Sequence, residues 1–338
     1  MRLAVSLLFL LGATAAPGRA QTTYHRTHSY LLGGDGGWDY IALDSIGHRL
    51  FIARQDRVMV VGADSGNLLG EIPGLNRAHG VAFDYAAHRG FATSGADSQV
   101  TIFDLRTLAV ISKVTAAIDD DGVFWDPATR RIYTMNGDAN SASVIDPVRG
   151  RRVANIPLGG KPEFGVSAGD GKFYVNLEDS AQVVEVDARA MRVARRWPLA
   201  PCGSPTGLAI DRAHHLLFSG CRSGVMAVSD YRAGRLVTTV PIGQGVDACR
   251  FDAATQTAFA SNGDGTITVI HEDAPDHFTP AGTIQTKSGA RTMELDPVTH
   301  RIYTVSADFG PAPEPGPGGR HGRPPVLPGT FVLLVLEP

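Results

Sequence analysis

The residues best suited to chemistry recur at one position in a series of similar segments. Seven short apolar segments each end in Asp or, in one case, Ser, and the side chain five residues earlier is mostly ionisable. These earlier residues are Asp39, His79, Asp121, Thr206, Asp247 and Arg291, with either Pro162 or, after a one-residue shift, Glu163 in the fourth segment. If the segments are equivalent units of a closed ring, these side chains converge on its axis. The sequence therefore predicts a carboxylate-rich site where the units meet.

Two interpretations of this ring of side chains stay open. In the first, carboxylate oxygens bind a hard cation such as Ca²⁺, with His79 as a further ligand or a general base. The predicted metal ligands are Asp39, Asp121, Glu163 and Asp247. In the second, the ring is a wet, polar channel mouth without a ligand, in which Arg291 offsets the repulsion between carboxylates.

Two neighbouring features bear on the same site. Trp38 precedes the first carboxylate and could stack on a ligand, although a tryptophan in this fold more often packs between repeat units. The run 119–121 contains Asp121 and adds two more carboxylates beside it, and an acidic run is typical of a solvated loop. The residues expected to bind a ligand are Trp38, Asp39, His79, Asp121, Glu163, Thr206, Asp247 and Arg291.

The sequence lacks the motifs that would identify a familiar cofactor or metal enzyme. It contains no phosphate-binding P-loop, no His-Glu-x-x-His and no Cys-x-x-Cys-His. We therefore expect a non-enzymatic protein that binds a small polar ligand, a cation or a partner protein at the ring. The alternative is a metal-dependent, lactonase-like hydrolase, in which the carboxylates hold a cation and His79 moves a proton.

A repeat must position these residues. In every copy an aromatic residue follows seven positions after the terminal Asp or Ser, and successive copies are 40 to 44 residues apart. The pairs are Asp44 and Phe51, Asp84 and Phe91, Asp126 and Tyr133, Ser167 and Tyr174, Asp211 and Phe218, Asp252 and Phe259, and Asp296 and Tyr303. This period is that of a four-stranded propeller blade, and the alternation of apolar and polar residues argues against helical repeats.

The predicted fold class is therefore an all-β, seven-bladed β-propeller, formed by residues 21–338 as a single domain. The last unit has predicted strands at 292–295, 301–305 and 331–336 but no fourth strand. Residues 29–33 resemble the fourth strands of other units. We expect this N-terminal strand to complete the last blade, which closes the ring and leaves no long exposed edge.

A segment rich in proline and glycine, 307–329, interrupts the last blade. It contains seven prolines and lies between the second and third predicted strands. Such a composition cannot form a packed core and indicates a surface loop. The loop is either a lid over the site or a tolerated insertion.

The repeat resembles that of the YVTN-type, YncE-like propeller family. The resemblance rests on Asp-Pro-x-x-x-Arg-Ile-Tyr-Thr, which occurs at 126–134 and again at 296–304. It implies the propeller fold over nearly the whole chain. It does not specify a function, because propellers of this kind include binding modules, enzymes and accessory proteins.

The N-terminal segment 1–20 has the features of a signal peptide. A charged Arg2 precedes the apolar run 3–11, and small residues at 18–20 offer a cleavage site. The apolar run is too short to span a bilayer. Without Arg2 and Arg19, 29 basic and 34 acidic residues leave a net charge of −5, which disfavours nucleic-acid binding. We expect a periplasmic or secreted monomer with no membrane span.

Export bears on the three cysteines. Cys202 and Cys221 flank the first two predicted strands of the fifth unit, and these ends of an antiparallel pair meet on one face. In an oxidising compartment we expect a Cys202–Cys221 disulfide, with Cys249 left free.

Overall fold

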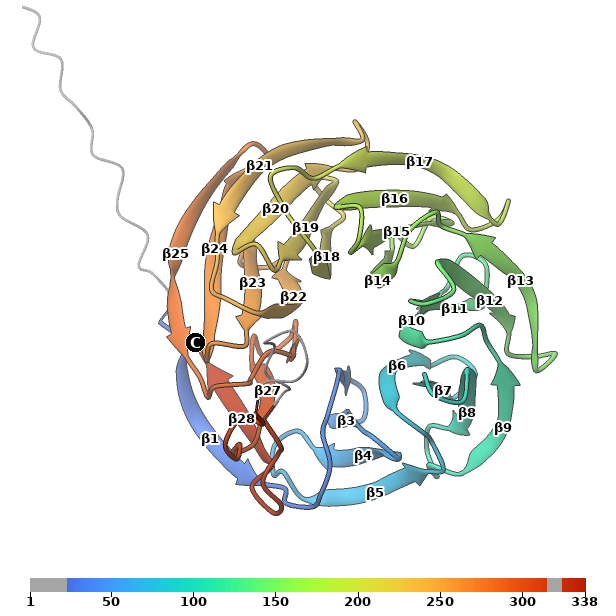
Figure 1. Ribbon diagram of the computed structural model, residues 1–338, viewed down its shortest axis with the longest axis vertical. Helices are drawn as coiled ribbons and strands as arrows, with labels where there is room; N and C mark the ends of the chain where they lie inside the picture. Colours follow the sequence, from blue (N-terminus) through green and yellow to red (C-terminus); the bar gives the residue numbers. More distant parts are fainter. Residues whose placement is uncertain (1–22, 315–323) are drawn as a thin grey trace, which may run out of the picture.

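The chain folds into a ring of seven four-stranded antiparallel sheets (Figure 1). This arrangement comes from a computed structural model that describes residues 23–314 and 324–338. Each sheet is one blade, with its first strand beside the central channel and its fourth strand at the rim. The predicted all-β, seven-bladed propeller is confirmed. The predicted signal segment, 1–20, lies outside the described residues.

Each blade contributes one strand to each of four concentric layers. The inner strands are β2 (Ile41–Asp44), β6 (Ala78–Asp84), β10 (Asp120–Asp126), β14 (Pro162–Ser167), β18 (Pro205–Asp211), β22 (Val246–Asp252) and β26 (Met293–Leu295). The second strands are β3 (Arg49–Arg54), β7 (Arg89–Ser94), β11 (Arg131–Asn136), β15 (Lys172–Leu177), β19 (Leu216–Cys221), β23 (Thr257–Asn262) and β27 (Ile302–Ser306). The third strands are β4 (Arg57–Gly62), β8 (Gln99–Asp104), β12 (Ser141–Asp146), β16 (Gln182–Asp187), β20 (Val225–Asp230), β24 (Thr266–Ala274) and β28 (Val332–Glu337). The rim strands are β5 (Leu68–Pro73), β9 (Val110–Thr115), β13 (Arg151–Pro157), β17 (Arg192–Pro198), β21 (Arg235–Pro241), β25 (His277–Gln285) and β1 (His25–Leu31).

The Asp of the repeat ends the first strand by shaping the turn that follows it. Its carboxylate accepts hydrogen bonds from backbone N–H groups of that turn, as Asp44 does from Gly47 at 3.0 Å. Side chains that bond their own backbone in this way favour turns over continued strands. In the fourth blade Ser167 replaces the Asp, and its Oγ accepts the N–H of Gly169 at 3.0 Å. The turn therefore survives the loss of the carboxylate.

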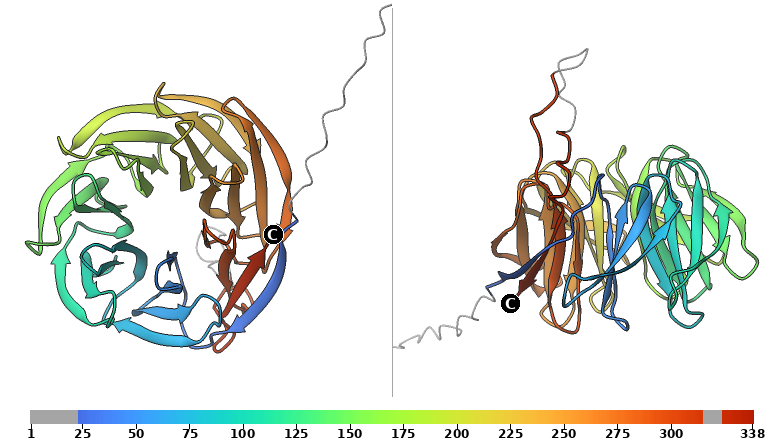
Figure 2. Two further views of the ribbon diagram at one scale, coloured as in Figure 1. Left: turned by 180° about the vertical axis from the view of Figure 1, so that it is seen from behind. Right: turned by 90° about the horizontal axis from the view of Figure 1, so that it is seen from below.

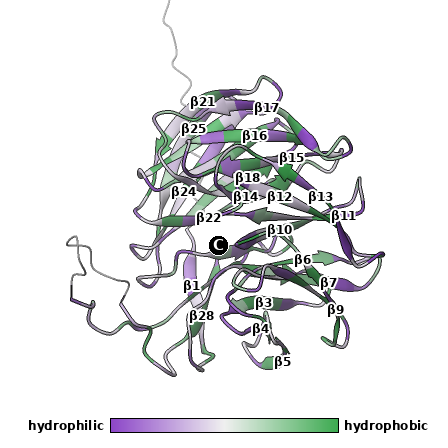
Figure 3. Ribbon diagram, turned by 45° about the vertical axis from the view of Figure 1, so that its right-hand side comes forward, coloured by the Kyte–Doolittle hydropathy of each residue, from purple (hydrophilic) through white to green (hydrophobic). Residues whose placement is uncertain are grey.

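The aromatic residue of the repeat builds the core. In the described residues, the buried apolar side chains form seven clusters, each lying between two neighbouring blades. Each cluster contains one of the repeat aromatics, and all seven of these rings are at most 1% exposed. Figure 3 shows hydrophobic stretches along the strands of the blades. The repeat therefore encodes the packing of each blade against the next.

The N-terminal strand closes the ring, as predicted. β1 pairs with β28 in the last blade, from His25 opposite Glu337 to Leu31 opposite Val332. The strand begins four residues earlier than expected, at His25, and ends before Leu32 and Gly33. These two residues still donate their N–H groups to the carbonyl of Phe331.

A buried arginine secures the segment between β1 and β2. Arg54 is fully buried, and its guanidinium lies 3.8 Å from the ring centroid of Phe331. It donates hydrogen bonds to backbone carbonyls of the glycine-rich segment, which are those of Gly33, Asp35, Gly36 and Gly37. Burial lowers the pKa of Arg54 to about 10, so the side chain stays charged at neutral pH. One cation therefore satisfies four carbonyls at the closure.

Two further features concern predictions made from sequence. Cys202 and Cys221 form a disulfide at the start of the fifth blade, and Cys249 is free and buried. The described parts of the 307–329 insertion project from one face of the ring, as the right panel of Figure 2 shows. Within the described ranges, no helix has the length and apolar character needed to span a bilayer.

Candidate functional site

The residues predicted to form a ring lie where the inner strands begin, and strand register decides the ambiguous position. Pro162 pairs with Leu177 at the start of β14, as Asp120 pairs with Asn136 at the start of β10. Glu163 is therefore the equivalent of Asp121. The paired residues that start β6, β18 and β22 likewise precede the predicted ring residues. A register irregularity follows at each of these starts, and such bulges re-aim side chains.

His79 joins two carboxylates from neighbouring blades. Its Nδ1 is hydrogen-bonded to Asp39 Oδ2 and lies 3.4 Å from Asp121 Oδ1. One ligand-type atom from each of the three residues lies within 4.8 Å of the others. His79 is buried, and the two carboxylate side chains are each 18% exposed. Three of the predicted ligand residues therefore meet at one point, open to solvent on one side.

The other ionisable residues of the ring contact arginines. Arg291 Nε donates to Asp247 Oδ2 at 2.8 Å, and its Nη2 lies 3.8 Å from Asp39 Oδ1. Glu163 lies 3.8 Å from Arg222, which pairs more closely with Glu178 at 3.2 Å. The four predicted carboxylate ligands therefore divide, with Asp39 and Asp121 at His79 and the other two beside arginines.

Burial leaves the mouth carboxylates poorly solvated. It raises the pKa of Asp121 to about 7, against the opposing effect of the His79 charge. Burial, followed by the charge of Asp121, raises the pKa of Glu163 to about 8, and burial also raises the pKa of Asp247. For His79, burial lowers the pKa, but the hydrogen bond that its ring donates to Asp39 and the charge of Asp121 raise it to about 9. The mouth therefore favours an added positive charge.

The acidic run 119–121 is not a solvated loop, as we expected, but part of the buried mouth. Asp120 is fully buried at the start of β10, and neither of its carboxylate oxygens has a hydrogen-bond partner among the described residues. Burial raises the pKa of Asp120 to about 8. Asp119 is also buried and pairs with Arg77 at 3.0 Å. The expectation failed because the run enters an inner strand, whose backbone pairing carries its side chains inside.

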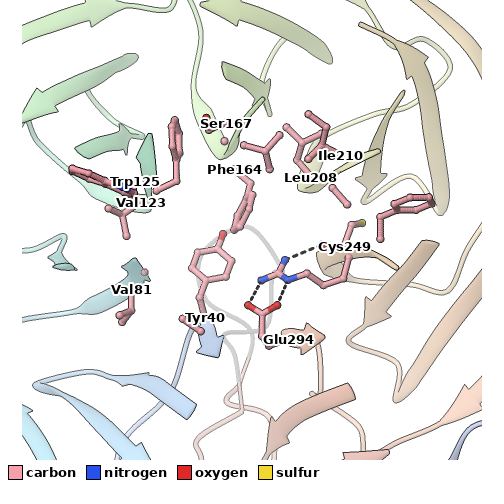
Figure 4. A pocket seen from close by; sticks show the side chains of 18 of the residues that line it. Tyr40, Val81, Val123, Trp125, Phe164, Ser167, Leu208, Ile210, Cys249 and Glu294 are labelled. Atoms are coloured by element: carbon pink, nitrogen blue, oxygen red, sulfur yellow. Dashed lines mark hydrogen bonds and ion pairs between the residues drawn. The ribbon is translucent and has the colours of Figure 1, made fainter. Parts of the chain in front are cut away.

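Two aromatic rings cross the channel just below the mouth. Tyr40 and Phe164 project into the channel from opposite sides, with ring centroids 5.2 Å apart in an edge-to-face arrangement (Figure 4). Beyond them lies a cavity of about 390 Å³ lined mostly by apolar residues of the inner strands. Arg250 and Glu294 form a two-point ion pair in its wall, at 2.7 and 3.1 Å. The rings thus lie between a charged mouth and a mainly apolar channel.

The remaining two predicted residues lie in the structural framework. Trp38 is 8% exposed and packs between the first and last blades, 5.2 Å from Phe331 between ring centroids. Thr206 is fully buried, and its hydroxyl donates to the carbonyl of Val246 in the next blade at 3.0 Å. The next residue, Gly207, has no room for a side chain, because a Cβ would lie 2.5 Å from the backbone nitrogen of Cys249.

A nucleophilic serine motif is present by sequence but is occupied structurally. Residues 165–169 match Gly-x-Ser-x-Gly, the motif of a strand-to-helix nucleophile elbow. Here Ser167 ends β14 and a β-hairpin turn follows, with no helix. Its hydroxyl donates to Asp126 at 2.6 Å while accepting the N–H of Gly169. Ser167 is therefore a turn residue.

Sequence reasoning missed several residues of the mouth. Tyr40 adjoins the predicted ring residue Asp39, so a search of the flanking positions would have found it. Arg222 comes from a loop in the fifth blade, and no spacing rule connects it to Glu163. Its position follows only from the folded ring.

Comparisons with known proteins support the fold and go no further. The chain matches no protein-family model and no curated protein sequence. Among solved structures it is similar to a chain of the crystal structure of the mitotic checkpoint complex, with a TM-score of 0.73 and 13% sequence identity. The similarity covers 89% of this chain and 95% of that chain. At this identity the likeness shows a shared propeller fold and does not specify a function.

Proposed function

We propose that this propeller is an exported binding protein that holds a divalent cation at the mouth of its channel. Asp39, His79 and Asp121 are the proposed ligands. The observation that carries the proposal is the convergence of three ligand-type atoms within 4.8 Å of one another, from three different blades. One of them, Asp121 Oδ1, is buried and accepts no hydrogen bond from the described residues.

The charge balance of the mouth supports a cation rather than an anion. Five buried or half-buried carboxylates surround this point, and the cations beside them are His79, Arg291 and Arg222. The five are Asp39, Asp120, Asp121, Glu163 and Asp247. Buried carboxylates repel one another unless a proton or a cation offsets their charge. A metal ion supplies two positive charges at one point.

The donor set narrows the class of cation. Ca²⁺ prefers six to eight oxygen ligands, whereas a site with one imidazole nitrogen and two carboxylates suits Zn²⁺ or Mn²⁺. Glu163 and Asp247 remain in the mouth as further acidic groups, and they attract a cation without contacting it. A small polar ligand that carries an amine would use the same carboxylates.

Export and family membership are part of the proposal. The segment 1–20 has the composition of a signal peptide. The disulfide between Cys202 and Cys221 supports an oxidising compartment, periplasmic or extracellular, because cytosolic thiols are usually kept reduced. The Asp-Pro-x-x-x-Arg-Ile-Tyr-Thr repeat supports a YncE-like propeller. We propose that the protein acts as a monomer.

A metal-dependent hydrolase is the second candidate function. What favours it is the solvent-exposed side of the cluster, since catalytic metal sites keep a coordination position open for water or substrate. The hydrolase hypothesis requires the same bound cation as the hypothesis of a binding protein. The metal test therefore comes first, and a screen of lactone hydrolysis follows only if an ion binds.

The test is a thermal-shift titration of chelator-treated protein with Ca²⁺, Mg²⁺, Mn²⁺ and Zn²⁺ in turn. An ion that binds only the folded protein raises the melting temperature as its concentration exceeds the dissociation constant. We expect Zn²⁺ or Mn²⁺ to raise it, and Asp121→Asn to abolish the part of the shift due to this site. Asp104→Asn, which changes an exposed turn far from the axis, is the matched control.

The proposal of a mouth cation fails if the response to every ion is the same in wild type and Asp121→Asn. The hydrolase would then fail as well. A propeller that binds an organic ligand or a protein partner would remain.

A further inference from the structure

A second cluster of ligand-type side chains lies at the other end of the inner strands, between the fifth and sixth blades. Asp211 ends β18, His214 lies in the turn that follows, and Glu272 lies on β24 of the next blade. His214 Nδ1 is 2.9 Å from Asp211 Oδ2 and 2.6 Å from Glu272 Oε1. The three ligand-type atoms lie within 4.8 Å of one another.

Glu272 departs from the repeat at a position that is otherwise apolar. Its backbone N–H donates to the turn between the first two strands of its own blade. The residues that make the same hydrogen bond in other blades are Ala63, Leu105, Ala188 and Tyr231, all of them buried. The sixth blade therefore places a carboxylate where its neighbours place an apolar side chain between blades.

His214 departs from the repeat in the adjoining blade. It stands three residues after the repeat Asp, and the other blades have no histidine there. The equivalent residues are Gly47, Ala87, Thr129, Asp170, Thr255 and Thr299. Two departures in neighbouring blades thus meet at one point, together with the carboxylate of Asp211.

The environment of Glu272 is unfavourable for a carboxylate without a cation. Its side chain is fully buried, and its close polar partner is the His214 imidazole, which lies 2.6 Å from Oε1, while Oε2 has no hydrogen-bond partner among the described residues. A buried carboxylate that lacks donors destabilises the fold unless a positive charge offsets it. His214 is 34% exposed, which leaves a path from solvent.

We propose that Asp211, His214 and Glu272 bind a divalent transition ion such as Zn²⁺, which links the fifth blade to the sixth. One imidazole nitrogen and two carboxylate oxygens are a donor set that Zn²⁺ accepts, with a fourth position open to water on the exposed side. This site is separate from the channel mouth, at the opposite ends of the inner strands, and does not depend on an ion there.

The experiment measures Zn²⁺ binding by calorimetry in chelator-treated protein that carries Asp121→Asn, so that the proposed mouth site is removed. We expect one ion per chain to remain bound in this background. Adding Glu272→Leu should abolish Zn²⁺ binding or weaken it at least 10- to 100-fold. Loss of an outer-shell partner alone reduces metal affinity by that factor, and Glu272 is a proposed direct ligand. Leucine is chosen because Leu105 occupies the equivalent position in the second blade.

Two further variants and two further measurements keep the test decisive. Circular dichroism checks that Glu272→Leu folds, and His214→Asn provides a second ligand variant. His300→Asn is the control, because His300 pairs with Asp252 of the preceding blade at 2.6 Å and with no second carboxylate among the described residues. Co²⁺ in place of Zn²⁺ should give visible absorption that is lost in both ligand variants and kept in the control.

The proposal is overturned if the Asp121→Asn protein binds no Zn²⁺, or binds it equally well after Glu272→Leu. In either case His214 and Glu272 form an ion pair only. A failure of the mouth site is recognised separately, because wild type and Asp121→Asn would then bind the same number of ions.

Discussion

The inner strands carry buried carboxylates at both ends, and the two ends treat them in opposite ways. At the channel mouth, burial raises the pKa of Asp120 to about 8 against the smaller lowering effect of backbone groups of Ser94 and Asp120, and no described residue donates a well-oriented hydrogen bond to either oxygen. At the other end, Asp296 is also buried, which raises its pKa, but hydrogen bonds from Thr299 and Val298 hold the value below the usual range.

Donors, rather than burial, distinguish these carboxylates. The turn after each inner strand presents backbone N–H groups to the repeat Asp, so hydrogen bonds stabilise the negative charge of its carboxylate. The mouth offers few such groups, because strand pairing already uses the backbone there. A carboxylate at the mouth is left to bind a proton, an arginine or a cation. The repeat Asp residues of the turn end therefore stabilise the fold, whereas the mouth carboxylates, like Glu272 beside Asp211 and His214 at the turn end, lack such donors.

The largest expected effect comes from removing a carboxylate of the turn end. Asp126 accepts hydrogen bonds from the backbone and hydroxyl of Thr129, at 2.9 and 2.6 Å, and from Ser167 at 2.6 Å. Asp126→Ala leaves these donors unpaired inside the protein. The free energy of unfolding should fall by about 3 kcal/mol, as measured by urea denaturation. Asp126→Asn keeps one acceptor and should cost less, and equal losses would contradict this account.

Removing a mouth carboxylate should stabilise the fold at high pH, whereas removing Asp126 destabilises it. The unfolded chain releases the proton of Asp120 near pH 4, whereas the folded chain holds it up to about pH 8. The folded state of chelator-treated wild type should therefore lose stability as pH rises from 4 to 8. Asp120→Asn removes the contribution of Asp120 and leaves those of Asp121 and Glu163, so at pH 9 the variant should be more stable than wild type by about 2 kcal/mol.

The measurement is the free energy of unfolding at several pH values between 4 and 9. Parallel curves for wild type and Asp120→Asn would contradict the raised pKa. Asp296 provides the comparison, because its contribution to the free energy of unfolding changes with pH in the opposite direction. Its lowered pKa contributes stability above about pH 4 that is lost as pH falls further through the folded value.

The smallest effect is expected from a carboxylate that has donors but is not buried. Asp104 ends β8 in an exposed turn and accepts the N–H groups of Arg106 and Thr107, both at 2.9 Å. Water replaces lost hydrogen bonds at such a site. Asp104→Asn should change the melting temperature by about 1 °C or less. If Asp104→Asn destabilised the protein as much as Asp126→Ala, hydrogen-bond donors would contribute to stability even at an exposed carboxylate.

The fold could be predicted from the sequence because each repeat element has one physical task. The Asp shapes a turn, and the aromatic seven residues later, such as Phe51 or Tyr133, fills the space between blades. The missing fourth strand of the last unit implied closure by the N-terminal strand, which β1 provides. Local chemistry and long-range pairing therefore agree along the whole chain.

The site could be predicted only in part. Equal spacing placed Asp39, His79 and Asp121 together, because the ring repeats one geometry. Spacing could not distinguish Thr206, whose hydroxyl bonds a neighbouring strand, from a residue that faces the channel. It also could not reveal Glu272, which meets His214 across two blades and stands out only when the equivalent residues are compared.

The pairing of β1 with β28 also determines how the ring responds to mechanical force. His25 lies opposite Glu337, so the outer ends of the two strands leave the blade side by side (Figure 2). The hydrogen bonds of an antiparallel pair run perpendicular to the strands. Tension that pulls residues 23 and 338 apart therefore breaks these bonds one pair after another instead of loading them together. The seam should open at low force, and the blades beside it should then unravel in sequence.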